Sequence, residues 1–203
     1  MTISAQDRER ISAAIRAAEA KTSGEIVCVL ARVSADAVSL PILIAAALAL
    51  ALPWLLVATT EMTVTRILLL QIAVFVVLAA VLCLPPVRVA LLPRAARRAV
   101  AYRMAREQFV SRGLARKKDR TGVLIFVSLA ERYARIIADE GIASRVPQSE
   151  WQGAVDTLTG HMHDGRIAEG FISAIDQCSR ALAAHFPRTE ASRDELPDRI
   201  YLI

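Results

Sequence analysis

Two apolar stretches dominate the sequence: residues 38–58, VSLPILIAAALALALPWLLVA, and residues 67–87, ILLLQIAVFVVLAAVLCLPPV. Neither stretch contains a charged residue, and their only strongly polar side chains are Ser39 and Gln71. As an α-helix rising ~1.5 Å per residue, each would be roughly 30 Å long, which is the thickness of the hydrocarbon core of a bilayer. The short connection at residues 59–66 has no room for a domain. The pattern predicts a two-helix transmembrane hairpin whose flanking segments lie on the same side of the membrane.

The positive charge of the chain is concentrated directly after the second apolar stretch. Eleven lysines and arginines lie between Arg88 and Arg120, where the only acidic residues are Glu107 and Asp119. Basic residues beside a membrane-spanning helix favour the cytoplasmic side. The first 24 residues are charged and helical in pattern, unlike a cleavable signal. We therefore expect a multi-pass protein of a bacterial inner membrane with both termini in the cytoplasm.

The basic stretch also predicts a helix that begins near Pro93. We expect its arginines to contact anionic lipid headgroups at the membrane surface. These residues are Arg94, Arg97, Arg98, Arg103 and Arg106. Nucleic acid is not an expected partner, because few aromatic residues interleave with the charges. Two placements of residues 94–112 stay open: on the membrane, or packed on a soluble domain.

The remaining segments predict one small soluble domain that the hairpin interrupts. An amphipathic helix over residues 5–20 and a buried strand over 25–33 precede the hairpin, and they need later partners to close a core. Strands at 121–129 and 133–139 read as an antiparallel hairpin, and two helices follow Pro147 and Gly165. The expected parts are residues 1–37 (helix and first strand), 38–87 (transmembrane hairpin), 88–187 (basic helix and remainder of the domain) and 188–203 (disordered tail). The predicted fold class is α/β, a small mixed sheet with helices packed on its faces.

Two further patterns concern the interior of this domain. Cys28, Cys83 and Cys178 are odd in number, widely spaced and surrounded by apolar residues, which is typical of buried free thiols. Trp151 shares a helix face with Val155 and Leu158, and we interpret it as a core residue rather than an exposed contact.

Residues 120–142, RTGVLIFVSLAERYARIIADEGI, resemble the strand, turn and strand of the TPM domain family. Residues 23–27, SGEIV, are similar to the first strand of that family, and residues 165–170, GRIAEG, to the start of its closing helix. The resemblance implies an α/β sandwich. It also implies two kinds of activity, since some members are described as phosphatases and others as accessory or repair proteins, with divalent cations for certain members.

Carboxylates after the second strand of this run are the candidate metal ligands. Asp139 and Glu140 follow the strand and Asp164 lies in a helix connection, so they could converge on Ca²⁺ or Mg²⁺. Glu131 and Arg132 in the intervening turn are interpreted as an exposed ion pair. No catalytic or cofactor-binding residue is assigned, because no serine lies in a nucleophile elbow and no glycine-rich phosphate loop is present.

Three functions are compatible with these patterns. The favoured one is a non-catalytic protein-interaction or accessory module for membrane complexes. The alternative is a divalent-cation-dependent phosphatase. The third is a structural module that oligomerises through the hairpin.

Overall fold

The computed structural model describes residues 3–34, 38–116, 120–188 and 196–203. The chain divides into two compact units, one formed by Met1–Ser34 with Arg98–Ile203 and the other by Ala35–Arg97. Each unit is described by itself below.

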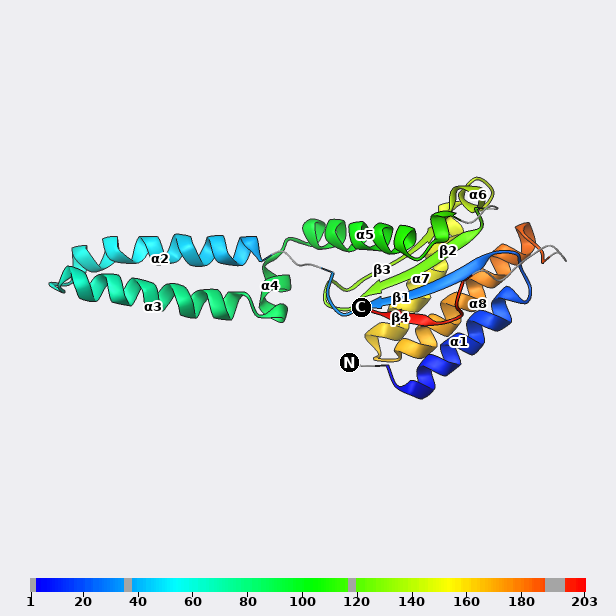
Figure 1. Cartoon of the computed structure of the whole chain (residues 1–203), viewed down its shortest axis with the longest axis horizontal. Coiled ribbons are helices and arrows are strands. Elements are labelled where there is room, and N and C mark those ends of the chain that lie inside the picture. Colours follow the sequence, from blue (N-terminus) through cyan, green and yellow to red (C-terminus); the bar gives the residue numbers. More distant parts are fainter. Residues whose placement is uncertain (1–2, 35–37, 117–119, 189–195) are drawn as a thin grey trace. The chain divides into compact units, whose positions relative to one another are not determined.

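The first unit is built on a four-stranded mixed sheet in the order β3-β2-β1-β4 (Figure 1). The strands are β1 (Glu25–Ala31), β2 (Gly122–Ser128), β3 (Tyr133–Ala138) and β4 (Ile200–Leu202). β1 runs parallel to both β2 and β4, with Cys28 opposite Ile125 and Ile200, whereas β2 and β3 form an antiparallel hairpin. Every residue of β1 and β2 is buried, as expected for strands covered on both faces. The predicted fold class, a small mixed sheet with helices on its faces, is confirmed.

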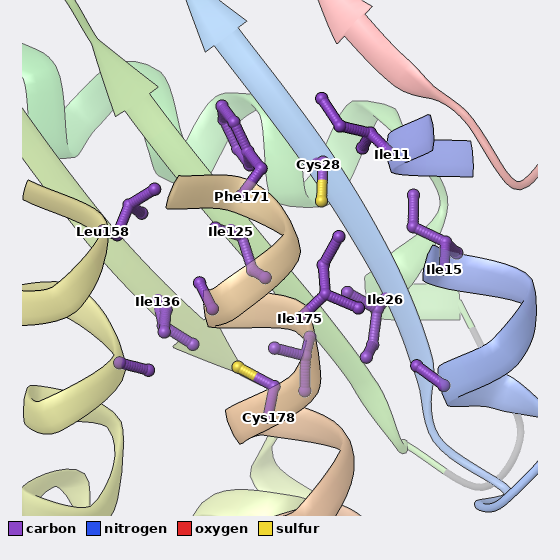
Figure 2. Close-up of a cluster of buried hydrophobic side chains, with 14 of the residues drawn as sticks. Ile11, Ile15, Ile26, Cys28, Ile125, Ile136, Leu158, Phe171, Ile175 and Cys178 are labelled. Atoms are coloured by element: carbon purple, nitrogen blue, oxygen red, sulfur yellow. The ribbon is translucent and has the colours of Figure 1, made fainter. Parts of the chain in front are cut away.

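Three long helices cover one face of this sheet. They are α1 (Ala5–Glu19), α7 (Gln148–His163) and α8 (Ile167–His185). Figure 2 shows their side chains meeting those of the strands, with Ile15 from α1, Leu158 from α7 and Phe171 from α8 among the fully buried residues. Trp151 is 2% exposed in the same cluster, which confirms it as a core residue. The predicted cap of the first helix is also present, since the Ser4 side chain accepts a hydrogen bond from the Asp7 N–H at 3.0 Å.

The opposite face is covered by α5 (Arg94–Ser111). Ala101, Ala105 and Phe109 recur every four residues along this helix and pack on Val27, Val29, Leu124 and Phe126 of the sheet. Small alanines let the helix approach the sheet closely. Of the two placements left open by the sequence, the structure therefore shows packing on the domain for the part of α5 that belongs to this unit. Gly113 ends the segment with φ +84°, the left-handed conformation that glycine adopts without strain.

The final residues of the chain join the sheet, so the prediction of a disordered tail over residues 188–203 is wrong for residues 200–202. β4 pairs with the otherwise open edge of β1, and the Ile203 N–H donates to the Leu30 carbonyl at 3.0 Å while the Arg32 N–H donates to the Ile203 carbonyl at 2.8 Å. The Tyr201 ring also contacts two guanidinium groups, with its centroid 3.9 Å from that of Arg112 and 4.9 Å from that of Arg199. Residues 189–195 of the predicted tail lie outside the described residues.

The second unit contains two long apolar helices that lie side by side and antiparallel (Figure 1). They are α2 (Ser39–Thr59) and α3 (Val64–Leu82), and both are long and apolar enough to cross a membrane. The predicted second span, residues 67–87, is shifted toward the N-terminus in the structure. Leu84 adopts an extended backbone before Pro85, which disfavours a continuing helix, and the two prolines then occupy the first turn of α4 (Pro85–Leu91).

The two buried thiols of the first unit should be chemically inert in the folded protein. Cys28 and Cys178 are fully buried and free, and burial raises the pKa of Cys178 to about 12 and that of Cys28 well above its ordinary value. At pH 8 both remain neutral thiols, and the thiolate is the reactive form. In a Cys83→Ser background we expect no alkylation by a small maleimide at pH 8, followed by labelling of both thiols in denaturant, measured by intact mass. Fast labelling without denaturant would contradict the burial.

Candidate functional site

The turn between β2 and β3 is fastened to the end of β1. The Leu129 N–H donates to the Ala31 carbonyl at 3.0 Å, and the Ala130 N–H donates to the Arg32 carbonyl at 3.1 Å. The turn closes when the Arg132 N–H donates to the Leu129 carbonyl at 3.2 Å, which places Arg132 at φ +50°. This left-handed conformation is uncommon for a residue with a side chain. The carboxyl ends of two parallel strands and the turn thus form one rigid corner.

A buried carboxylate organises this corner. Glu131 is 5% exposed, and the Ser34 N–H donates to both of its oxygens at 3.0 Å. The Ser128 hydroxyl donates to Glu131 Oε2, while the Ser34 hydroxyl donates to Ser128 Oγ at 2.8 Å. The interpretation of Glu131 and Arg132 as an exposed ion pair is therefore wrong for Glu131. Ser34 comes from the other side of the hairpin in the sequence, so the sequence alone could not place a donor over this carboxylate.

A cleft of about 730 Å³ opens beside the corner. The turn lines one side of it and the C-terminal end of α7 lines the other, through Thr159, Met162 and His163. Arg32 and Arg132 also line the cleft, and no carboxylate does so among the described residues. Its volume lies within the range of natural ligand sites. A lining of both cationic and apolar side chains favours an anionic ligand that carries an apolar group.

Ser128 lies in this cleft but is not presented as a nucleophile. It is fully buried, its hydroxyl proton is directed at Glu131, and its oxygen accepts from Ser34. A general base would need to face a substrate-accessible hydroxyl to activate it. The described hydrogen bonds instead give Ser128 and Glu131 the role of holding the corner together.

The structure does not bring the three predicted metal ligands together. Asp139 accepts a hydrogen bond from the Glu140 N–H at 2.7 Å and caps α6 (Glu140–Ala143), and Glu140 forms an ion pair with Arg120 at 2.6 Å. Asp164 follows α7 beside the β2–β3 turn, whereas Asp139 follows the other end of β3, roughly 20 Å away for a six-residue strand.

Asp164 is held by a different partner. It pairs with Arg166 at 2.7 Å, and this hydrogen bond keeps the pKa of the Asp164 carboxyl below its ordinary value. Asp139 Oδ2 is buried and has no hydrogen-bond partner among the described residues, but Glu140 beside it is already neutralised by Arg120. Ca²⁺ takes six to eight oxygen ligands. Within the described ranges no group of three His, Cys, Asp or Glu side chains is placed to hold a metal ion, and the three carboxylates do not converge on one position.

The basic residues predicted at the membrane surface fall on both units. Arg103 points to solvent and pairs with Glu107 at 3.3 Å, while Arg98 lines a second cleft beside β3. Arg94 and Arg97 belong to the second unit. Contact of these arginines with lipid, including Arg106, stays a prediction.

Three residues of this corner, one arginine and two serines, could not be recognised from the sequence. Arg32 and Ser34 follow β1, and Ser128 ends β2, so all three lie at the carboxyl ends of parallel strands. Such ends meet at one edge of a sheet and commonly form binding crevices. The available signal was polar residues directly after two buried strands, but it has meaning only once the two strands are known to be neighbours.

A four-stranded mixed sheet with α5 on one face and α1, α7 and α8 on the other defines an α/β sandwich. The sequence model of the TPM domain family matches residues 85–181, which include the β2–β3 turn, α7 and most of α8. Residues 85–181 therefore match a TPM domain, and the resemblance to this family is confirmed for that part of the chain.

One solved structure of similar fold is the NMR structure of the BA42 protein from the psychrophilic bacterium Bizionia argentinensis. The TM-score is 0.62 with 21% sequence identity, and the alignment covers 100% of this chain and 96% of that one. At this identity the likeness concerns the fold. No curated protein matches the sequence.

Proposed function

We propose that this chain is an integral protein of a bacterial inner membrane whose TPM domain works in the cytoplasm as a non-catalytic interaction or accessory module for membrane complexes. Three arguments support the proposal: the surface of the hairpin, the distribution of positive charge and the chemistry of the corner beside Glu131.

The surface of the hairpin is the observation that carries the proposal. Only 17% of the most apolar window of α2 and 6% of that of α3 are buried. Leu43, Trp54 and Leu69 are 65%, 82% and 63% exposed. A core helix of a water-soluble domain would be mostly buried, and a patch of this kind in water would drive aggregation. In a lipid environment these side chains contact apolar acyl chains, which removes the tendency to aggregate.

The distribution of charge supports the orientation. The connection between α2 and α3 carries no basic residue from Thr60 to Thr63, whereas the chain after α3 is strongly basic. Basic residues are retained on the cytoplasmic side. Both ends of the hairpin, and with them the two sequence segments of the TPM domain, are then cytoplasmic.

An interaction role is favoured over the alternative, a divalent-cation-dependent phosphatase. Asp164 lies apart from Asp139 and Glu140, and the hydroxyl of Ser128 is engaged in the corner. The cleft beside the β2–β3 turn offers arginine and tyrosine side chains, which are enriched where proteins bind one another.

Cysteine labelling in intact bacteria tests the topology. We expect Thr60→Cys, in the connection between α2 and α3, to react with a membrane-impermeant maleimide added to whole cells. The matched variant Arg8→Cys, on the exposed face of α1, should react only after permeabilisation. Both are made in a Cys83→Ser background and read by gel shift. The reverse pattern would place the TPM domain in the periplasm, and labelling of neither in membranes would reject the hairpin as a span.

A further inference from the structure

A second cleft of about 560 Å³ lies next to the first, on the outer side of β3. The two clefts share Arg132, Tyr133, Ala134 and Thr159 in their linings. They are therefore parts of one groove, which we name the β3 groove. It passes from the β2–β3 turn to a space bounded by α5 through Arg98 and Tyr102 and by α7 through Gln148 and Gln152. Figure 1 shows these two helices on opposite faces of the sheet.

The charge of the β3 groove has one sign. Its arginines are Arg32, Arg98, Arg132 and Arg135. No carboxylate lines either cleft among the residues that the structure describes. The nearest acidic group of the turn, Glu131, is buried and accepts hydrogen bonds from Ser34 and Ser128. An unbalanced group of arginines attracts an anionic partner and steers its approach.

The groove is also lined by apolar and aromatic side chains, some of which are held in place by their neighbours. Arg135 stacks over the Tyr102 ring at 4.7 Å, which fixes both side chains as one wall between β3 and α5. Val127, Leu129 and Met162 are among the residues that line the first cleft, and Val155 lines the second. Arg132, at the junction of the two clefts, is held by the strained left-handed turn. Arginine and tyrosine in such settings are the residues that dominate protein interfaces.

We propose that the β3 groove binds an extended acidic peptide of a protein partner, in which carboxylates alternate with apolar side chains. Carboxylates would pair with the four arginines, and the intervening apolar side chains would enter the two clefts. An extended chain places successive side chains on opposite sides, which suits a groove lined by both arginines and apolar side chains. This inference rests on the proposed interaction role and gives it a location and a class of ligand.

Fluorescence anisotropy with the full chain in phosphatidylcholine nanodiscs tests the proposal. The probe is a fluorescein-labelled octapeptide of alternating glutamate and leucine, and the matched peptide has glutamine in place of glutamate. We expect the glutamate peptide to bind about tenfold more tightly than the glutamine peptide, with a difference that shrinks at high salt. Equal binding of the two peptides would overturn the proposal.

Protein variants locate the binding. Arg132→Gln and Arg135→Gln should each weaken the glutamate peptide about fivefold. Arg98→Gln tests the side of the groove formed by α5 without disturbing the turn, because no hydrogen bond or ion pair is described for Arg98. Arg8→Gln on α1 is the control that should leave binding unchanged. Equal loss in Arg8→Gln would assign the binding to net charge. Binding of phosphatidylglycerol vesicles that falls with the groove variants, without binding of the peptide, would assign the groove to lipid headgroups.

Failure of this proposal is separable from failure of the proposed function. A chain that binds no acidic peptide but crosslinks to a defined membrane complex through another surface would reject the groove and leave the accessory role standing. A periplasmic TPM domain in the labelling experiment would reject the cytoplasmic role whatever the peptide does.

Discussion

Replacing Glu131 with alanine is expected to lower the free energy of unfolding of the TPM domain by about 3 kcal/mol. The substitution removes the acceptor for the Ser34 N–H and for the Ser128 hydroxyl, and both donors lie in the buried corner beside β1 and β2. Glu131→Gln keeps one acceptor oxygen but turns an N–H₂ group toward a donor, so a loss of about half that size is expected.

The midpoint of urea denaturation measures the effect of Glu131. The chain has two tryptophans, and a Trp54→Phe background leaves the buried Trp151 as the reporter of the TPM domain. Glu140→Gln is the control, because Glu140 is exposed and its removal should leave the midpoint unchanged. An unchanged midpoint in Glu131→Ala would show that water replaces Glu131 as the acceptor for the Ser34 N–H and the Ser128 hydroxyl. Glu131 would then not explain the rigidity of the turn that lines the β3 groove.

Removal of residues 200–203 is expected to cost about 4 kcal/mol and to promote self-association. Ile200 is 6% exposed, and Ile203 exchanges two backbone hydrogen bonds with the β1 segment. Without β4, the edge of β1 presents unpaired N–H and C=O groups along a strand that is apolar on both faces.

Light scattering after size exclusion measures the self-association, and the same tryptophan signal measures stability. Leu202→Gln is the matched control, because Leu202 is 46% exposed and the substitution keeps the backbone pairs. It should stay monodisperse at the size of the parent in detergent. A truncated chain that is as stable and as dispersed as the parent would show that β4 is an incidental contact.

Local patterns predicted most elements of the fold. The uninterrupted apolar runs around Cys28 and Ile125 identified two covered strands, and Ser4 with Asp7 marked the start of the first helix. Pro147 and Gly165 bounded the helix between them. In each case the determining interaction lies within a few residues, so the sequence contains all of it.

The errors concern interactions between distant segments. Glu131 appears exposed until Ser34 is known to lie over it, and Ile200 appears to belong to a charged tail until the edge of β1 is known to be free. The sequence suggests that Asp164 lies near Asp139 because each follows a helix or a strand, but α7 runs antiparallel to β3 and carries Asp164 back to the opposite end of that strand. None of these residues can be placed until the order of the strands is known, including the parallel pairing of β1 with β2 at the centre of the sheet.

The parallel pairing of β1 with β2 also sets an order of events during synthesis. β1 leaves the ribosome before the hairpin, whereas its partner follows about a hundred residues later, which at ordinary translation rates is a delay of about 5–20 s. In that interval α2 and α3 emerge and, under the proposed function, insert into the membrane, while β1 waits as a solitary apolar strand. Under that proposal, a slower insertion step lengthens the exposure of β1 to aggregation and chaperones, so the yield of folded protein would depend on the speed of the membrane insertion machinery.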